Sequence, residues 1–176
     1  MRVLLFALLV LALVVPPGAV ASDEYVTWTT SAEGSGDVRV GVFEVADAHC
    51  AYELMADADK LVEALEHLEG VDIHEERSGF QDLTLHERFF LVGLVKTRYH
   101  RNRDGDHEVS WRLIEGRQKR HDGTWTVTPF KDGGGRVEFR NLIEAKSVLH
   151  RPLLRRIQDK TMPDIATATV RTCGKR

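Results

Sequence analysis

The chain has 176 residues, of which 43% are hydrophobic and 29% are charged, and its formal net charge is −3 at pH 7. This length and balance suit one folded domain with its own hydrophobic core. A weakly negative chain gives no electrostatic support to nucleic-acid binding, so we expect no nucleic-acid partner.

The first residues have the pattern of a secretory signal. Arg2 precedes an apolar run over residues 3–15, and two prolines and the small residues Ala19 and Ala21 follow. We predict that residues 1–21 are a signal peptide and that the protein is exported to a periplasmic or extracellular compartment. A retained membrane anchor is the alternative, but the apolar run is shorter than the roughly 20 residues that span a bilayer.

The exported part of the chain contains two cysteines, Cys50 and Cys173. An oxidising compartment permits them to form one disulfide. They can equally remain two buried thiols that act as small apolar side chains. The residues alone leave both possibilities open.

Residues 22–37 form an N-terminal extension, in which a short strand-like stretch is followed by a flexible or turning segment over residues 31–37. The main domain is expected over residues 38–176 and begins with a strand over residues 38–45. Two short helices follow. We expect Asp47 to cap the first helix, Asp59 to cap the second and Gly70 to end it.

From residue 71 onward the apolar residues recur with a period of two, which predicts six further strands. Glycines mark the turns between them, at Gly79, Gly93, Gly105, Gly123 and Gly133. Short sequential hairpins favour antiparallel pairing, so the pattern predicts an antiparallel meander.

A long helix is predicted from Pro152 to the end of the chain. Its expected inner stripe consists of Leu153, Leu154, Ile157, Ile165, Ala166, Thr169, Val170 and Cys173. Because Pro163 removes one helical hydrogen bond, we expect a kink or a brief break near residues 160–162.

One spacing in the C-terminal half is more specific than the rest. The pattern W-x4-G-x2-K-x3-G-x-W is formed by Trp111, Gly116, Lys119, Gly123 and Trp125. Pro129, a glycine-rich turn over residues 132–135 and the long helix follow it. The segment resembles the START-like, or SRPBCC, superfamily, nearest to its polyketide cyclase/dehydrase-type and coenzyme Q-binding-protein-type domains.

This resemblance covers roughly residues 39–171 and implies an α+β helix-grip (START-like) fold. Such a fold has a curved antiparallel sheet of about seven strands around a long C-terminal helix, with two short helices after the first strand. It also places the end of the long helix near the short helices, which implies that Cys50 and Cys173 lie within bridging reach.

The resemblance covers proteins of many activities and specifies architecture better than chemistry. Our leading hypothesis is a non-enzymatic protein that holds a hydrophobic small molecule, such as a lipid, quinone or polyketide-like compound, between the sheet and the helix. Large apolar residues in the inner phase of the strands are consistent with either a solid core or an aromatic-walled pocket. Inward polar residues favour a ligand, unless a bulge turns them to solvent. The ligand-binding residues we expect are Glu87, Phe89, Tyr99, Trp111, Trp125, Phe139, Asn141, Ile157 and Ile165.

No metal-ligand spacing or nucleophile motif is present in the sequence, so we assign no metal, cofactor or catalytic residue. Two alternatives stay open: a cyclase or dehydrase with Glu87, Tyr99 or a histidine as acid or base, and a protein-interaction module. A basic cluster of Arg98, His100, Arg101 and Arg103 is compatible with contact to a membrane surface, although a solvated hairpin also explains it. We expect a monomer.

Overall fold

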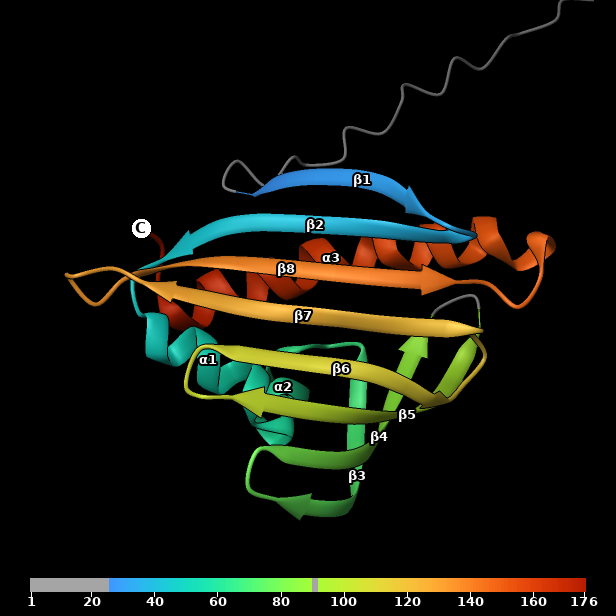
Figure 1. Cartoon of the computed structure of the whole chain (residues 1–176), viewed down its shortest axis with the longest axis horizontal. Helices are drawn as coiled ribbons and strands as arrows, with labels where there is room; N and C mark the ends of the chain where they lie inside the picture. Colours follow the sequence, from blue (N-terminus) through green and yellow to red (C-terminus); the bar gives the residue numbers. More distant parts are fainter. Residues whose placement is uncertain (1–25, 90–91) are drawn as a thin grey trace, which may run out of the picture.

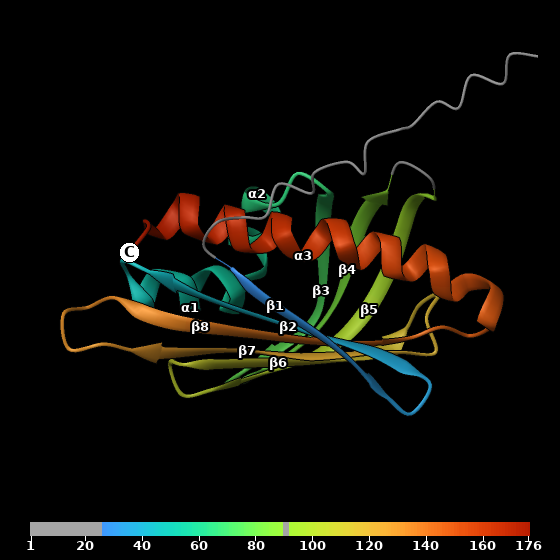
Figure 2. The same cartoon turned by 90° about the horizontal axis from the view of Figure 1, so that it is seen from above.

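The structure, a computed structural model, describes residues 26–89 and 92–176. A single antiparallel sheet has the strand order β1-β2-β8-β7-β6-β5-β4-β3. The helices α1, α2 and α3 all lie on one face of this sheet (Figures 1 and 2). The predicted helix-grip fold is therefore confirmed, whereas the predicted signal peptide lies outside the described residues.

The strands of the sheet are long, and short turns join consecutive strands except β2 and β3, which are separated by α1 and α2. Their bounds are β1 Thr27–Glu33, β2 Gly36–Val45, β3 Leu68–Arg77, β4 Phe80–Phe89, β5 Gly93–Asp104, β6 Glu108–Glu115, β7 Arg120–Pro129 and β8 Gly135–Glu144. The helices are α1 Ala48–Ala56, α2 Ala58–Ala64, the short 3₁₀ helix η1 Val148–His150 and α3 Arg151–Cys173.

In the N-terminal segment, the strand-like stretch is strand β1 and the glycines after it form a turn. Strands β1 and β2 form a tight hairpin in which Glu33 pairs with Gly36, and Gly34 in the turn has a φ of +59°. Because glycine adopts this conformation without steric cost, the turning alternative for this segment holds and the glycines close a hairpin. Strand β1 thus adds an eighth strand to the seven that were expected.

The two short helices begin at aspartates. Asp47 accepts a hydrogen bond from the Cys50 backbone N–H, which confirms it as the cap of α1. Asp57, and not Asp59, caps α2, since its side chain accepts from the N–H groups of Asp59 and Lys60. Helix α2 ends at Ala64, so the expected end at Gly70 is wrong and that glycine lies in β3.

Four of the five glycines expected in turns have positive φ, namely Gly79, Gly93, Gly105 and Gly133. Gly123 is the exception, because it lies inside β7, opposite Trp111 of β6. A Cβ atom there would come within 2.2 Å of Trp111 Cζ2 and 2.6 Å of the Arg140 carbonyl oxygen. Gly123 is therefore required for close packing rather than for a turn.

Helix α3 runs without a break through Pro163, so the expected interruption is absent. Its buried stripe contains Gln158, Met162, Ala166, Thr169 and Cys173, which recur at helical spacing. Packing along this stripe holds the helix continuous although proline removes one backbone hydrogen bond.

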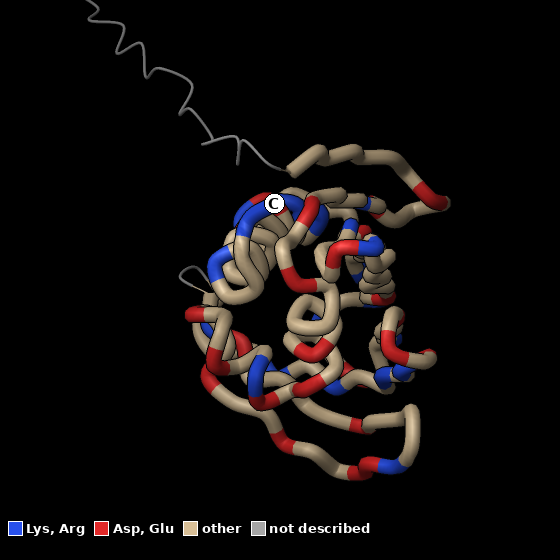
Figure 3. Tube along the Cα trace, turned by 90° about the vertical axis from the view of Figure 1, so that its left-hand side faces the viewer, with Lys and Arg blue, Asp and Glu red and all other residues tan. Residues whose placement is uncertain are grey.

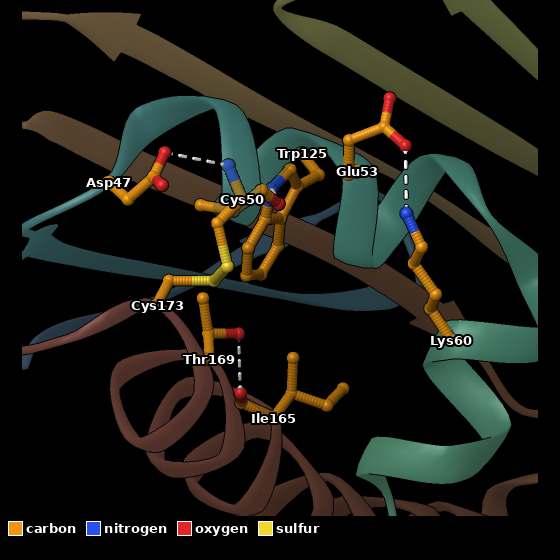
Figure 4. Close-up of a disulfide and its surroundings, with 9 residues drawn as sticks. Asp47, Cys50, Glu53, Lys60, Trp125, Ile165, Thr169 and Cys173 are labelled. Atoms are coloured by element: carbon orange, nitrogen blue, oxygen red, sulfur yellow. Dashed lines mark hydrogen bonds and ion pairs between the residues drawn. A yellow bond between two sulfur atoms is a disulfide. The ribbon is translucent and has the colours of Figure 1, made fainter. Parts of the chain in front are cut away.

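A disulfide joins Cys50 of α1 to Cys173 at the end of α3, with a Cα–Cα distance of 5.5 Å (Figure 4). Trp125 of β7 packs beside it and donates a hydrogen bond from its indole N–H to the Ala51 carbonyl oxygen (3.1 Å). Short helix, long helix and sheet thus meet at this end of the molecule, as the resemblance implied.

Candidate functional site

The side chains that face α3 can be read from the strand register. Arg39 of β2 lies opposite Asn141 of β8, and Phe139 lies opposite Trp125 of β7. Cross-strand partners share one face of a sheet, so these residues form rows beneath the helix. Towards α1 the rows are closely packed, because Trp125 is fully buried and Phe139 is 2% exposed.

The packing loosens towards the opposite end of the sheet. Leu85, Glu87 and Phe89 of β4, Leu113 of β6 and His121 of β7 belong to the inner face by register, yet each is only partly buried. In Figure 2, β3, β4 and β5 curve up beside α3 at this place. The interior is therefore solid near the disulfide and more open beside β4.

Helix α3 is fixed to the sheet along its β2 side. Asp37 of β2 accepts two hydrogen bonds from each of Arg151 and Arg155, at 2.7 to 2.9 Å. These guanidinium groups hold the pKa of Asp37 well below its usual range. One helical turn later Asp159 pairs with Arg39. The first half of α3 is thus held from one side.

The other side of α3 borders a groove with a volume of about 710 Å³. Its walls come from the α2–β3 connection, the end of β4 and α3 itself. Leu65, Phe89, Leu153 and Ile157 supply apolar surface, and charged side chains lie among them. The charged residues are Glu66, Arg88, Arg156, Lys160, Asp164 and Arg171. Size and composition suit an amphipathic small molecule with an apolar body.

A chain of hydrogen bonds crosses the inner face near this groove. His121 lies between Tyr99 and Asn141, with Nδ1 2.8 Å from the Tyr99 hydroxyl and Nε2 2.9 Å from Asn141 Oδ1. Because Asn141 Oδ1 can only accept, Nε2 carries the proton and Tyr99 donates to Nδ1. Burial lowers the pKa of His121 to about 4, so the ring is neutral at physiological pH.

Glu87 extends this polar row on β4. Its Oε2 accepts a hydrogen bond from the Thr97 hydroxyl at 3.0 Å, and Thr97 precedes Tyr99 by two residues on the same face of β5. Burial raises the pKa of Glu87 to about 7, and it raises the pKa of Tyr99 well above its ordinary value. A carboxyl group with this pKa can hold or release a proton near neutrality.

The residues expected at the ligand site separate into three groups. Phe89 and Ile157 line the groove. Glu87, Tyr99 and Asn141 face inward in the polar row, and not to solvent. The remaining residues pack in or against the main core: Trp111, Trp125, Phe139 and Ile165.

Two residues of the site were missed by sequence reasoning. His121 alternates in phase with Gly123 and Trp125, but the expected turn at Gly123 hid this pattern. Gln158 is 1% exposed and occupies the helical stripe four residues before Met162. Its spacing could have revealed it, but a stripe of apolar residues alone does not include an amide.

Two arginines of the basic cluster on β5 pair with acidic neighbours, and a third is buried. Arg98 forms two hydrogen bonds with Asp82, and Arg103 pairs with Glu76. Arg101 is buried rather than solvated, with Nη1 3.3 Å from Gln81 Oε1. On the side shown in Figure 3, charges of both signs alternate. This cluster therefore offers no separate cationic surface.

Within residues 26–89 and 92–176, no group of histidine, cysteine, aspartate and glutamate side chains has an arrangement that could hold a metal ion. In the same part of the chain, no helix combines the length and the apolarity needed to cross a bilayer.

Comparison with solved structures identifies the same architecture in several proteins. The Zhui aromatase/cyclase from Streptomyces sp. R1128 is similar with a TM-score of 0.71 at 16% identity, over 77% of this chain and 92% of that protein. A START superfamily protein from Mycobacterium smegmatis gives 0.66 at 14% identity, over 77% of this chain and 96% of that one. Human STARD10 gives 0.64 at 8% identity, over 83% and 72%.

These TM-scores, at identities of 8 to 16%, show a shared START-like fold. A search of curated proteins gave no match. The sequence itself matches one family model over residues 45–170, which extend from the end of β2 almost to the end of α3 and include the groove and the polar row. The chain belongs to the family described as polyketide cyclase/dehydrase and lipid transport.

Proposed function

We propose that this protein binds a hydrophobic small molecule, such as a lipid, quinone or polyketide-like compound, in the groove between α3 and the end of β4, and carries it without changing it. The groove of about 710 Å³ is the observation that carries this proposal. A ligand tail laid against Phe89 and Ile157 would gain roughly 25 cal/mol for each Å² of apolar surface removed from water. The family description, polyketide cyclase/dehydrase and lipid transport, supports the same class of ligand.

The way α3 is attached to the sheet supports a route by which a ligand could enter the groove. The helix is held on its β2 side by the Asp37 ion pairs and at its end by the disulfide, whereas the groove follows its other side. A small rotation about the β2 side would widen the groove without breaking these attachments. The whole helix, rather than a break at Pro163, is then the moving lid.

We also propose that the protein acts after export, as a monomer. The disulfide supports this, because such bonds persist in oxidising compartments. Contact with a membrane surface would accompany delivery of a lipid. The exposed pair Val148 and Leu149, directly before α3, is the described apolar surface best placed for such a contact.

A second candidate function is favoured by Glu87. This buried carboxyl group has a pKa of about 7 and lies in one row with Tyr99 and His121. In a dehydration, Glu87 would take the proton next to a carbonyl group and return it to the departing hydroxyl, so that the net change is loss of one water. The similarity to an aromatase/cyclase supports this candidate.

A tryptophan in the groove tests the binding proposal. Thr161 lines the groove from α3, so Thr161→Trp should fill it and weaken binding of the uncharged fluorescent dye phenyl-α-naphthylamine at least about tenfold. Thr172→Trp is the matched control, because Thr172 is exposed on α3 and is not among the groove-lining residues. Equal dye affinity of the two folded variants, measured by fluorescence titration, would contradict the groove as the binding site.

A further inference from the structure

Behind the Phe89 wall of the groove, on the inner face of β4, lies a polar group for which the fold supplies no counter-charge. Glu87 accepts one hydrogen bond from Thr97, and no cation pairs with it among the described residues. Burying a carboxyl group without an opposite charge costs stability. Its presence in the interior is therefore not explained by folding, and it points to a functional role.

The position of Glu87 links it to the groove. It lies two residues before Phe89 on β4, so the two side chains share the inner face of that strand, and Phe89 forms part of the groove wall. Glu87 also keeps part of its surface accessible. A ligand lying against Phe89 would reach Glu87 next as it extends inward.

A second unsatisfied group approaches from the helix. Both amide atoms of Gln158 are buried without a hydrogen-bond partner among the described residues. Gln158 follows Ile157, which lines the groove, and precedes Asp159, which pairs with Arg39 of β2. Since Arg39 is the cross-strand partner of Asn141, Gln158 faces the part of the sheet where the polar row ends.

We propose that Glu87, backed by Thr97 and continued by the Tyr99–His121–Asn141 chain towards Gln158, is a polar subsite that selects ligands carrying an uncharged hydroxyl or carbonyl group. This inference rests on the proposed binding function and names the ligand chemistry of that site. The subsite binds the polar end of the molecule, and the groove binds its apolar body.

The surroundings favour an uncharged group over an ion. His121 and Tyr99 are neutral, and the side chains of Asn141 and Gln158 are dipoles without net charge. An anion would be repelled by ionised Glu87, and Arg39 is already neutralised by Asp159. A cation would have to lose its hydration to pair with a carboxyl group that burial keeps partly protonated near pH 7. A hydroxyl or carbonyl group can use the dipoles without the cost of desolvating a charge.

A panel of ligands with one ring system tests this subsite. We expect β-naphthol to bind about tenfold more tightly than naphthalene, and more tightly than β-naphthoate or the naphthylmethylammonium ion. Glu87→Met should reduce the preference for β-naphthol over naphthalene to less than about twofold, while the affinity for naphthalene itself stays the same. Glu87→Gln should retain the preference. Isothermal titration of each ligand measures these ratios.

The chain offers a matched control on the opposite face of the sheet. Glu108 of β6 also accepts a hydrogen bond from a threonine hydroxyl, that of Thr126 across the strands, so Glu108→Met should leave the preference unchanged. Equal affinity for β-naphthol and naphthalene, or tighter binding of either ion, would overturn the subsite proposal but would not contradict the groove as the binding site. Failure of all four ligands to bind would overturn the groove and the subsite together. If Glu87→Met does not fold, the binding ratios of the wild type and of Glu87→Gln test the subsite by the same criteria.

Discussion

At the scale of single residues, the raised pKa of Glu87, the residue proposed to bind the ligand, makes the stability of the fold depend on pH. Its folded pKa of about 7 lies above the 4.5 of an ordinary glutamate because burial disfavours the charged form. The folded protein therefore binds this proton more tightly than the unfolded chain. This contribution to the free energy of unfolding is fully present below pH 4.5 and is lost as the pH rises through 7. The loss is at most about 3 kcal/mol.

Replacing this carboxyl group should remove its pH dependence. We predict that the free energy of unfolding of Glu87→Gln, relative to the wild type, rises between about pH 4.5 and 7 and is constant above that range. His121, whose pKa is lowered, acts in the opposite direction, but it is present in both proteins and cancels in the difference. Urea unfolding across this pH range measures the effect, and a difference that does not change with pH would contradict it.

Single residues also show why the site was only partly predictable. Period-two alternation correctly placed Glu87, Tyr99 and Asn141 on the inner face, since side chains alternate along a strand. It could not tell that Trp125 fills the core while Phe89 borders a groove. That distinction depends on how far the sheet curves away from α3, and no local pattern in the sequence reports it.

At the scale of elements, the attachments of α3 divide the interior. Its end is joined to α1 by the disulfide and to the β2–α1 connection by backbone hydrogen bonds, including Asp47 N–H to the Cys173 carbonyl oxygen (3.1 Å). The middle of the helix borders the groove on one side and packs on the sheet through Met162. The continuity of α3 through Pro163 follows from this packing, which sequence propensity does not include.

The disulfide should be a large contribution to stability. The two cysteines are 123 residues apart, and closing so long a loop lowers the entropy of the unfolded chain by an amount worth roughly 4 to 5 kcal/mol. We predict that the double variant Cys50→Ala, Cys173→Ala loses stability of this order in guanidinium unfolding. A reductant should destabilise the wild type and leave the variant unchanged. Equal unfolding midpoints of the two proteins without reductant would contradict the prediction.

At the scale of the whole molecule, the order of the elements was predictable because each one has a local signal. Aspartate at a helix start, glycine at a hairpin and the change of period from helix to strand depend on nearby residues only. The exceptions, β1 and Gly123, depend on tertiary contacts: β1 pairs with β2 at the edge of the sheet, and Gly123 accommodates Trp111. Local signals thus defined the architecture, and tertiary contacts determined where it is hollow.

The central claim is that a hydrophobic molecule occupies the groove beside α3, and native mass spectrometry of protein purified from its own compartment tests it most directly. We predict that the wild type and Thr172→Trp carry an added mass that organic solvent releases as an intact hydrophobic compound, and that Thr161→Trp carries none. A released compound that differs from the loaded one by the loss of water would favour the dehydratase candidate over carriage. Wild-type protein that is free of any bound compound, and that takes up none when offered lipids and quinones, would contradict the account.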